Sequence, residues 1–278
     1  MLQESDTVGV FPTPIDQILS AANVQEIPDQ TLDPSFLSRM RSKAEGALKS
    51  ALKKVLGLFD SVSRFIFIDK QLYIKKQNFV RLHEAGHAFM PWQNDSYKLV
   101  EESELTLSEE IADQFDVEAN VFASEVIFQN DAFIKEAVAS SFSIKVPMRL
   151  AKKFDASIYA SIRQYVSKHY MCCTVLVFDM PAYNNGAGFT CSLRRCVSSQ
   201  KFMDEFSNVQ WPSILTPDYE ISSMIPLGNR RMSGQRQFAL VDDNGISHEF
   251  TAEGFTNTYQ VFVLLHENKA LTETRVIF

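Results

Sequence analysis

The chain is poor in the residues that mark several classes of protein. It has only 4 cysteines among 278 residues, too few for a disulfide-stapled scaffold. Its 10 glycines and 10 prolines exclude a fibrous or low-complexity protein. No apolar run approaches the roughly 18 residues that a transmembrane helix needs. The formal net charge of -7 argues against a protein that binds nucleic acid over its whole surface.

Other features predict where the protein works. The first residues, "MLQESDTVGVFPTPIDQ", lack the basic start and apolar run of a signal peptide. Together with the sparse cysteines, this predicts a cytoplasmic protein with reduced thiols and no membrane association. The hydrophobic content of 45% is enough for a sizeable core, in one large domain or two modest ones.

Two textures divide the chain. Up to about residue 170 the pattern is mostly helical, whereas "MCCTVLVFDM", "GFTCSLRRCV", "RQFALVDDNGISHEF" and "YQVFVLLHE" are strand-like, with a hairpin signal at "DDNG". We therefore predict an α+β protein. Residues 1–170 form a mostly helical domain with a short N-terminal sheet, and residues 171–278 form a smaller β-rich domain for sensing or substrate recognition.

Within the first domain we expect several elements in order. A long helix spans about 33–58, with Asp33 as N-cap, and "RFIFIDKQLYIKK" forms two short strands. A helix then carries "NFVRLHEAGHAFMPW", and another runs from about Ser108, a good N-cap, to about Phe128. Residues 146–169 form two short helices with a turn near Asp155.

The motif "HEAGH" suggests metal chemistry. His83 and His87 lie four residues apart, so both imidazoles project from one face of a helix and can bind one ion. Glu84 is displaced by about 100° around the axis, which keeps it off the metal but near a metal-bound water. Gly86 has no side chain and lets another segment or a substrate approach. A five-residue motif is only a moderate signal, because chance also produces it.

Catalytic zinc takes three protein ligands and keeps one position open for water, so a third ligand is required. The best candidate is Asp116 in "DVEAN" on the following helix, with Asn120 one turn further as a supporting second-layer group. Glu118 points about 200° away from Asp116 and is the alternative if the helix register is shifted. The pattern predicts a single Zn²⁺ ion.

With both helices in place, the sequence resembles the ImmA/IrrE family of metallopeptidases. The resemblance rests on "NFVRLHEAGH", on "DVEANVFASEV" and on the later segment "LAKKFDASIYASIRQYV", and it covers roughly residues 15–170. Two features depart from the family pattern. Glutamate often stands where Asp116 stands here, and "VIFQND" replaces the usual "LLMP" after the second helix.

The resemblance implies a gluzincin-like, or zincin-like, fold with zinc on His83, His87 and Asp116. It implies Glu84 as the catalytic base of an endopeptidase whose substrate is a DNA-binding repressor of the helix-turn-helix type. Cleavage would switch on stress, mobile-element or toxin–antitoxin genes. Some relatives carry a GAF-like sensor domain after the peptidase, which we carry over to residues 171–278 only by analogy.

In this mechanism Glu84 takes a proton from the metal-bound water and passes it to the leaving amine. The oxyanion needs a further donor, for which Tyr97 and Tyr165 are candidates, although packing is the commoner role of such tyrosines.

Two other functions stay open. A DNA-binding regulator would read its site with residues 146–169, which have helix-turn-helix spacing and several basic residues, although no direct nucleic-acid contact is expected in the favoured interpretation. A non-catalytic zinc-holding interaction module is the other alternative. The four cysteines lack the spacing of a zinc knuckle and are expected to be reduced core thiols.

Overall fold

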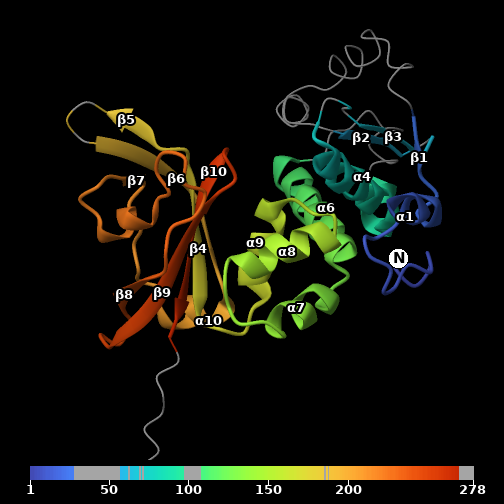
Figure 1. Ribbon diagram of the computed structural model, residues 1–278. Helices are drawn as coiled ribbons and strands as arrows, with labels where there is room; N and C mark the ends of the chain where they lie inside the picture. The colour runs from blue at the N-terminus through green and yellow to red at the C-terminus, as the bar shows by residue number, and fades with distance from the viewer. Residues whose placement is uncertain are drawn as a thin grey trace, which may run out of the picture. The chain divides into compact units, whose positions relative to one another are not determined.

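The structure is a computed structural model that describes residues 1–27, 57–61, 63–68, 70, 72–96, 108–184, 186 and 188–268. The chain splits into two compact units (Figure 1). The first unit consists of Met1–Phe133 and Lys152–Ser157, and the second of Ile134–Ala151 and Ile158–Phe278. The domain boundary predicted near residue 170 stays a prediction. Two segments before that residue, 134–151 and 158–170, already belong to the second compact unit.

The first unit combines a small sheet with helices that pack beside it. In chain order its elements are α1 (Ile15–Ala21), β1 (Gln25–Glu26), β2 (Gly57–Asp60), β3 (Phe65–Ile68), α4 (Ile74–Phe89) and α6 (Glu109–Phe128). The sheet has the order β1-β3-β2, with β1 parallel and β2 antiparallel to β3. Helix α4 packs against β2 and β3 on one side and against α6 on the other.

Two apolar clusters hold this unit together. Ile66 and Ile68 of β3 pack with Leu19 of α1 and with Val80 and Ala85 of α4, all nearly or fully buried. The alternating burial of β3 follows from the period of two along a strand.

The second cluster is aromatic and lies at the C-terminal end of α6. Phe128 contacts Phe133 edge to face, with ring centroids 4.8 Å apart, and Phe154 lies 5.3 Å from Phe133. The carboxyl end of α6 is thereby anchored in the core of the unit.

Two predictions for this region need correction or fall outside the described residues. The second strand predicted over "QLYIKK" is wrong, because α4 begins at Ile74. A few alternating apolar residues could not be distinguished from the first turn of a long helix. Most of the helix predicted over 33–58 lies outside the described residues, and its last residues form strand β2 instead.

Three helices follow α6: α7 (Asp131–Val138), α8 (Lys145–Lys153) and α9 (Ile158–Lys168). Helices α8 and α9 confirm the two short helices predicted over residues 146–169. The turn between α8 and α9 contains Asp155 in the left-handed region, with φ of 48°. Aspartate tolerates this conformation better than most residues, which is why it can stand there without glycine.

The second unit is built on an antiparallel sheet, as its strand-like segments predict. Its elements after α9 are β4 (Cys173–Asp179), β5 (Ala182–Asn184), β6 (Gly188–Ser198), α10 (Gln200–Glu205), β7 (Ile214–Leu215), η2 (Glu220–Met224), β8 (Arg236–Val241), β9 (Ser247–Thr256) and β10 (Gln260–Glu267). The strand order is β5-β6-β4-β10-β9-β8, with β7 paired to β6. Figure 1 shows β4, β9 and β10 as long neighbouring strands.

A buried apolar cluster holds the second unit together. Leu176, Phe178, Phe250 and Val263 belong to one buried cluster, and α9 and α10 pack against β4. The predicted hairpin joins β8 to β9, where Gly245 has φ of 84°, a value that favours glycine. With a helical unit and a sheet unit, the chain is an α+β protein.

In the described part of the chain, no helix is both long and apolar enough to cross a membrane. The four cysteines are unpaired; three of them are buried in the second unit and Cys196 is exposed. Burial raises the pKa of Cys172 and of Cys173 to about 12, so both are thiols at neutral pH.

Candidate metal centre

Helix α4 carries the two histidines of the motif through the interior of the first unit. Leu82 and Ala85 are fully buried, and Glu84 and His87 are also buried. A helix that is buried on most of its circumference must bring its polar groups to partners inside the protein. The polar residues of this segment therefore need an internal explanation.

Helix α6 is the element that approaches this polar segment. Ser108 caps it, accepting the N–H of Ile111, as the sequence predicts. Ala119 and Ala123 of α6 are fully buried, and a Cβ added to Gly86 would lie 3.4 Å from the Cα of Ala119. The segment that Gly86 admits is thus α6, and the close approach brings Asp116 towards the histidines.

The structure brings His83, His87 and Asp116 together. The two Nε2 atoms are 3.1 Å apart, and Oδ1 of Asp116 lies 3.8 Å from Nε2 of His83 and 3.7 Å from Nε2 of His87. Within the described residues, these side chains form one of two groups with the composition and spacing of a metal site.

The donor set fits a zinc ion. The point equidistant from the three atoms lies about 2.1 Å from each, and zinc bonds to imidazole nitrogen and carboxylate oxygen measure about 2.0–2.2 Å. The set is two imidazoles and one carboxylate, and three protein ligands leave a fourth position open, as catalytic zinc requires. The Asp116 side chain is 55% exposed, so solvent can reach the site on that side.

The electrostatics favour neutral imidazoles. Burial and the neighbouring His87 lower the pKa of His83 to about 3, and burial also lowers the pKa of His87. Burial, together with Asp116, raises the pKa of Glu84 to about 8. Burial raises the pKa of Asp116 as well, while His87 lowers it. A cation placed among these groups would offset the raised pKa values of the two carboxyl groups and would favour the neutral form of both imidazoles still further.

Sequence reasoning missed Gln93. It is fully buried in the helical segment 91–96 that follows α4, and its Oε1 lies 2.6 Å from Nδ1 of His87. Its Nε2 donates to Glu118 at 2.7 Å. Glu118, the alternative third ligand, is held by this amide and by the Trp92 indole at 2.8 Å. The only signal in the sequence is a glutamine six residues after His87, and burial of its amide is visible only in the structure.

Asn120 lies near His83, as expected for a supporting residue. Its side chain raises the pKa of His83, against the larger effects that lower it. Nδ1 of His83 is nevertheless buried without a well-formed hydrogen bond among the described residues. A metal-ligating histidine usually hydrogen-bonds an outer partner through its second ring nitrogen, and Nδ1 is that nitrogen in His83.

The two tyrosines have different outcomes. Tyr97 lies outside the described residues. Tyr165 is fully buried in the second unit, stacked on Phe142 at 4.8 Å, and its hydroxyl accepts the N–H of Ser143 at 3.4 Å. This burial favours packing as the role of Tyr165.

A second acidic cluster lies in the other unit. Cys172, Glu205 and Glu267 have the spacing of a metal group. Lys201 already lies 3.1 Å from Glu267 and 3.8 Å from Glu205, and the neighbouring His248 bonds Glu267 at 2.8 Å. The cluster is thus an ion-pair network with its own cation.

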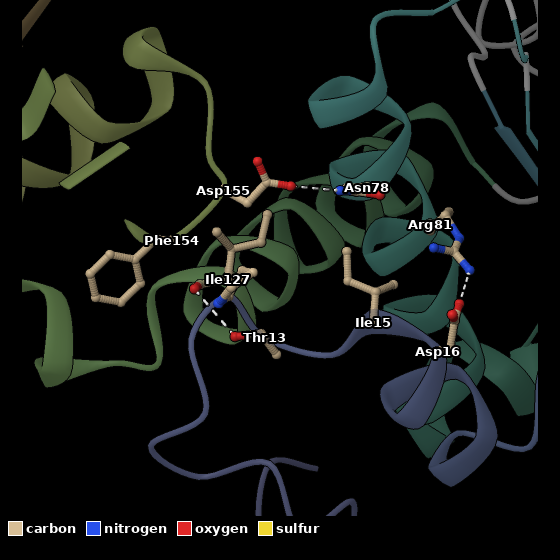
Figure 2. Close-up of a pocket in the computed structure, with 9 residues that line it drawn as sticks. Thr13, Ile15, Asp16, Asn78, Arg81, Ile127, Phe154 and Asp155 are labelled. Carbon is tan, nitrogen blue, oxygen red and sulfur yellow. Dashed lines mark hydrogen bonds and ion pairs between the residues drawn. The ribbon is translucent and has the colours of Figure 1, made fainter. Parts of the chain in front are cut away.

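A hollow of about 180 Å³ lies on another face of α4 (Figure 2). Its charged walls are already paired: Arg81 with Asp16, and Asp155 with the amide of Asn78 at 3.3 Å. It is smaller than the roughly 300 Å³ at which ligand pockets begin, and its lining includes none of the three metal-centre residues. The histidine–aspartate group is therefore the better candidate for chemistry.

Comparison with known proteins identifies a family for the part of the chain that contains these residues. Residues 45–161 match the family Peptidase M78, the IrrE N-terminal-like domain, which confirms the resemblance to the ImmA/IrrE family. No curated protein matches the chain. Among solved structures, a Mycobacterium tuberculosis transcriptional regulator is similar in fold, with a TM-score of 0.52 and 11% identity. The similarity covers 100% of this chain and 78% of the regulator.

Proposed function

We propose that this chain, whose residues 45–161 belong to the IrrE N-terminal-like Peptidase M78 family, is a zinc-dependent endopeptidase of the cytoplasm. Its substrate is one specific regulatory protein, a DNA-binding repressor of the helix-turn-helix type. Cleavage relieves repression in a stress, mobile-element or toxin–antitoxin response. The observation that carries the proposal is the triangle of donor atoms from His83, His87 and Asp116.

The polar residues of the motif and Asp116 each have a role in this proposal. His83, His87 and Asp116 hold one Zn²⁺. A bound zinc ion supplies Lewis-acid chemistry and lowers the pKa of a coordinated water to about 7. Glu84 acts as general base, accepting a proton from the attacking water and delivering it to the leaving amine. Burial and Asp116 raise the pKa of Glu84 in the metal-free site, and a cation bound beside it would lower that pKa, so that the carboxylate could accept the proton.

The decisive experiment separates binding from turnover. The parent, Glu84→Gln and the matched control Glu110→Gln are loaded with zinc and incubated with helix-turn-helix repressors from the same genome. Glu110 is an exposed carboxylate on the same α6 that carries Asp116. Mass spectrometry of the products maps the cleaved bond.

Glu84→Gln is expected to bind zinc and cleave nothing, whereas Glu110→Gln cleaves as the parent does. Cleavage by Glu84→Gln at the parent's rate would refute the assignment. If all three bind zinc and none cleaves any repressor, the non-catalytic zinc-holding module takes its place.

Residues 171–278, the β-rich part of the second unit, are proposed to be a GAF-like sensor domain. Support comes from their antiparallel sheet, in which the first and last long strands, β4 and β10, are neighbours in the middle of the strand order. A small molecule that raises the melting temperature of the zinc-loaded protein and alters its cleavage rate would support a sensor. Deletion of residues 173–268 with no effect on regulated cleavage would refute it.

A second candidate function is DNA binding by residues 146–169. The turn at Asp155 and the exposed basic residues Lys152, Arg163 and Lys168 favour it. Binding to duplex DNA that weakens steeply with salt and is lost in Arg163→Gln would revive it. Unchanged binding in that variant, or none in the parent, would remove it.

A further inference from the structure

Gln93 connects His87 of the candidate metal centre to Glu118, a carboxylate outside the group of three candidate ligands. The amide is fully buried between them. Its Oε1 lies 2.6 Å from Nδ1 of His87, and its Nε2 lies 2.7 Å from Oε2 of Glu118 and 3.3 Å from the backbone oxygen of Phe115. Both ends of the amide are therefore engaged.

The groups that bond the NH₂ end of the Gln93 amide determine which ring nitrogen of His87 carries a proton. An ionised carboxylate and a backbone carbonyl accept hydrogen bonds and cannot donate them, so the NH₂ group of Gln93 must face Glu118 and Phe115. The amide oxygen then faces His87 and can only accept. Nδ1 of His87 must carry a proton, which leaves the lone pair of the neutral ring on Nε2. That is the atom that faces His83 and Asp116.

Glu118 is held as a carboxylate in this arrangement. Its oxygens accept from the Trp92 indole at 2.8 Å, from Gln93 at 2.7 Å and from the Gln114 amide at 3.1 Å. A carboxylate that accepts three hydrogen bonds keeps its charge and polarises the amide that bonds it.

We propose that Gln93 and Glu118 form a positioning relay that holds His87 in the tautomer in which Nδ1 carries the proton and the Nε2 lone pair can bind the metal. Ligating histidines usually donate their second nitrogen to a carboxylate, carbonyl or water. Here the neutral amide of Gln93 accepts that hydrogen bond. The Glu118 carboxylate polarises the amide and so strengthens the bond to His87. This inference rests on the proposed metal site but not on any substrate, so the two can fail separately.

Two readouts that do not depend on catalysis test the relay. The first is the tautomer of His87 in chelator-treated protein, from long-range ¹H–¹⁵N NMR correlations assigned by loss of the signal in His87→Gln. The second is the affinity for Zn²⁺ alone, from competition with a chromophoric chelator. The variants are Gln93→Leu, Glu118→Gln, the swapped pair Gln93→Glu/Glu118→Gln and, as matched control, Gln114→Leu. Gln114 also bonds Glu118, but at the other carboxylate oxygen, Oε1, at 3.1 Å.

The parent and the Gln114→Leu control are expected to show the Nδ1–H tautomer and the same zinc affinity. Gln93→Leu shifts His87 towards the Nε2–H tautomer and weakens zinc binding by about 10- to 100-fold, the usual effect of removing an outer partner. Glu118→Gln weakens zinc binding less. The swapped pair restores the Nδ1–H tautomer and the affinity, because it again places an acceptor against His87 and a donor at position 118.

Packing alone would give a different result. If Gln93 only fills space, Gln93→Leu keeps the tautomer and binds zinc as the parent does, and the relay is refuted. Failure of the swapped pair to restore the tautomer also refutes it, whether or not Gln93→Leu folds. A normal relay in a protein that cleaves no repressor would refute the proposed substrate only.

Discussion

Gly86→Ala tests whether the close approach of α4 and α6 sets the candidate metal centre. The added Cβ would lie 3.0 Å from Cδ1 and 3.3 Å from Cγ of Phe122, and 3.4 Å from Cα of Ala119. The Phe122 ring or the whole of α6 must therefore move by a few tenths of an ångström. Overpacking of this kind costs about 1–3 kcal/mol, against a gain of about 1 kcal/mol in helix propensity.

The net expectation is a loss of about 1 kcal/mol in the free energy of unfolding, which lowers Tm by roughly 2–4 °C. The effect on metal binding should be larger. Oδ1 of Asp116 is already 3.7 Å and 3.8 Å from the two imidazole nitrogens, and retreat of α6 lengthens both distances. We expect zinc affinity to fall by on the order of tenfold.

The assay is chelator competition for zinc together with urea unfolding of the chelator-treated protein. Phe122→Leu is the control, and the double variant Gly86→Ala/Phe122→Leu should recover the affinity, since the smaller side chain makes room for the new Cβ. The reasoning fails if Gly86→Ala binds zinc as tightly as the parent and melts at a higher temperature. A fall in affinity that Phe122→Leu cannot rescue would also count against it.

Three further predictions concern metal and pH. Chelator should lower the Tm of the zinc-loaded parent but not of Asp116→Ala, since a ligand at 100 times its Kd stabilises by about 2.7 kcal/mol; equal shifts would refute the site. Burial lowers the pKa of His169 from 6.5 to about 4, with its Nδ1 accepting the N–H of Met171 at 3.1 Å, so the folded state resists protonation. Stability should fall as the pH drops through this window, by about 2 kcal/mol at pH 5, and urea unfolding of His169→Gln should show a flatter profile. Glu267, then Asp242, raise the pKa of His248, so its contribution is complete below about pH 6.5 and disappears as the pH rises through the folded value. His248→Gln should therefore lower Tm more at pH 6 than at pH 9, and an equal loss at both would contradict the ion pair.

Local patterns were enough to predict the helices that carry the site. The i, i+4 spacing of His83 and His87 and the N-cap at Ser108 each concern one turn of helix, where sequence and geometry are tightly linked. The relation between the two helices could be anticipated only in part. Gly86 indicated that something approaches α4, and the structure identifies it as α6.

What the sequence could not reveal depends on contacts between distant segments. Gln93 follows α4 in a short helical segment whose direction decides whether its amide meets His87 or solvent. No periodic pattern encodes that direction. For the same reason the sequence leaves Glu118 as an alternative ligand, whereas in the structure it bonds Gln93 and Trp92. Tyr165 is helical as predicted, but only tertiary packing could show that its hydroxyl is buried.

The choice of aspartate at position 116 is linked to the small residues between α4 and α6. A glutamate at this position would extend the carboxylate by one carbon–carbon bond, about 1.5 Å. A shorter arm serves the same metal only if the helices lie closer together, and the fully buried Ala119 and Ala123 allow α6 to approach Gly86. The length of the side chain at position 116 and the separation of α4 and α6 therefore act together on the distance between the carboxylate and the histidines. A larger side chain between the two helices should weaken zinc binding in the same way as a shorter carboxylate side chain would.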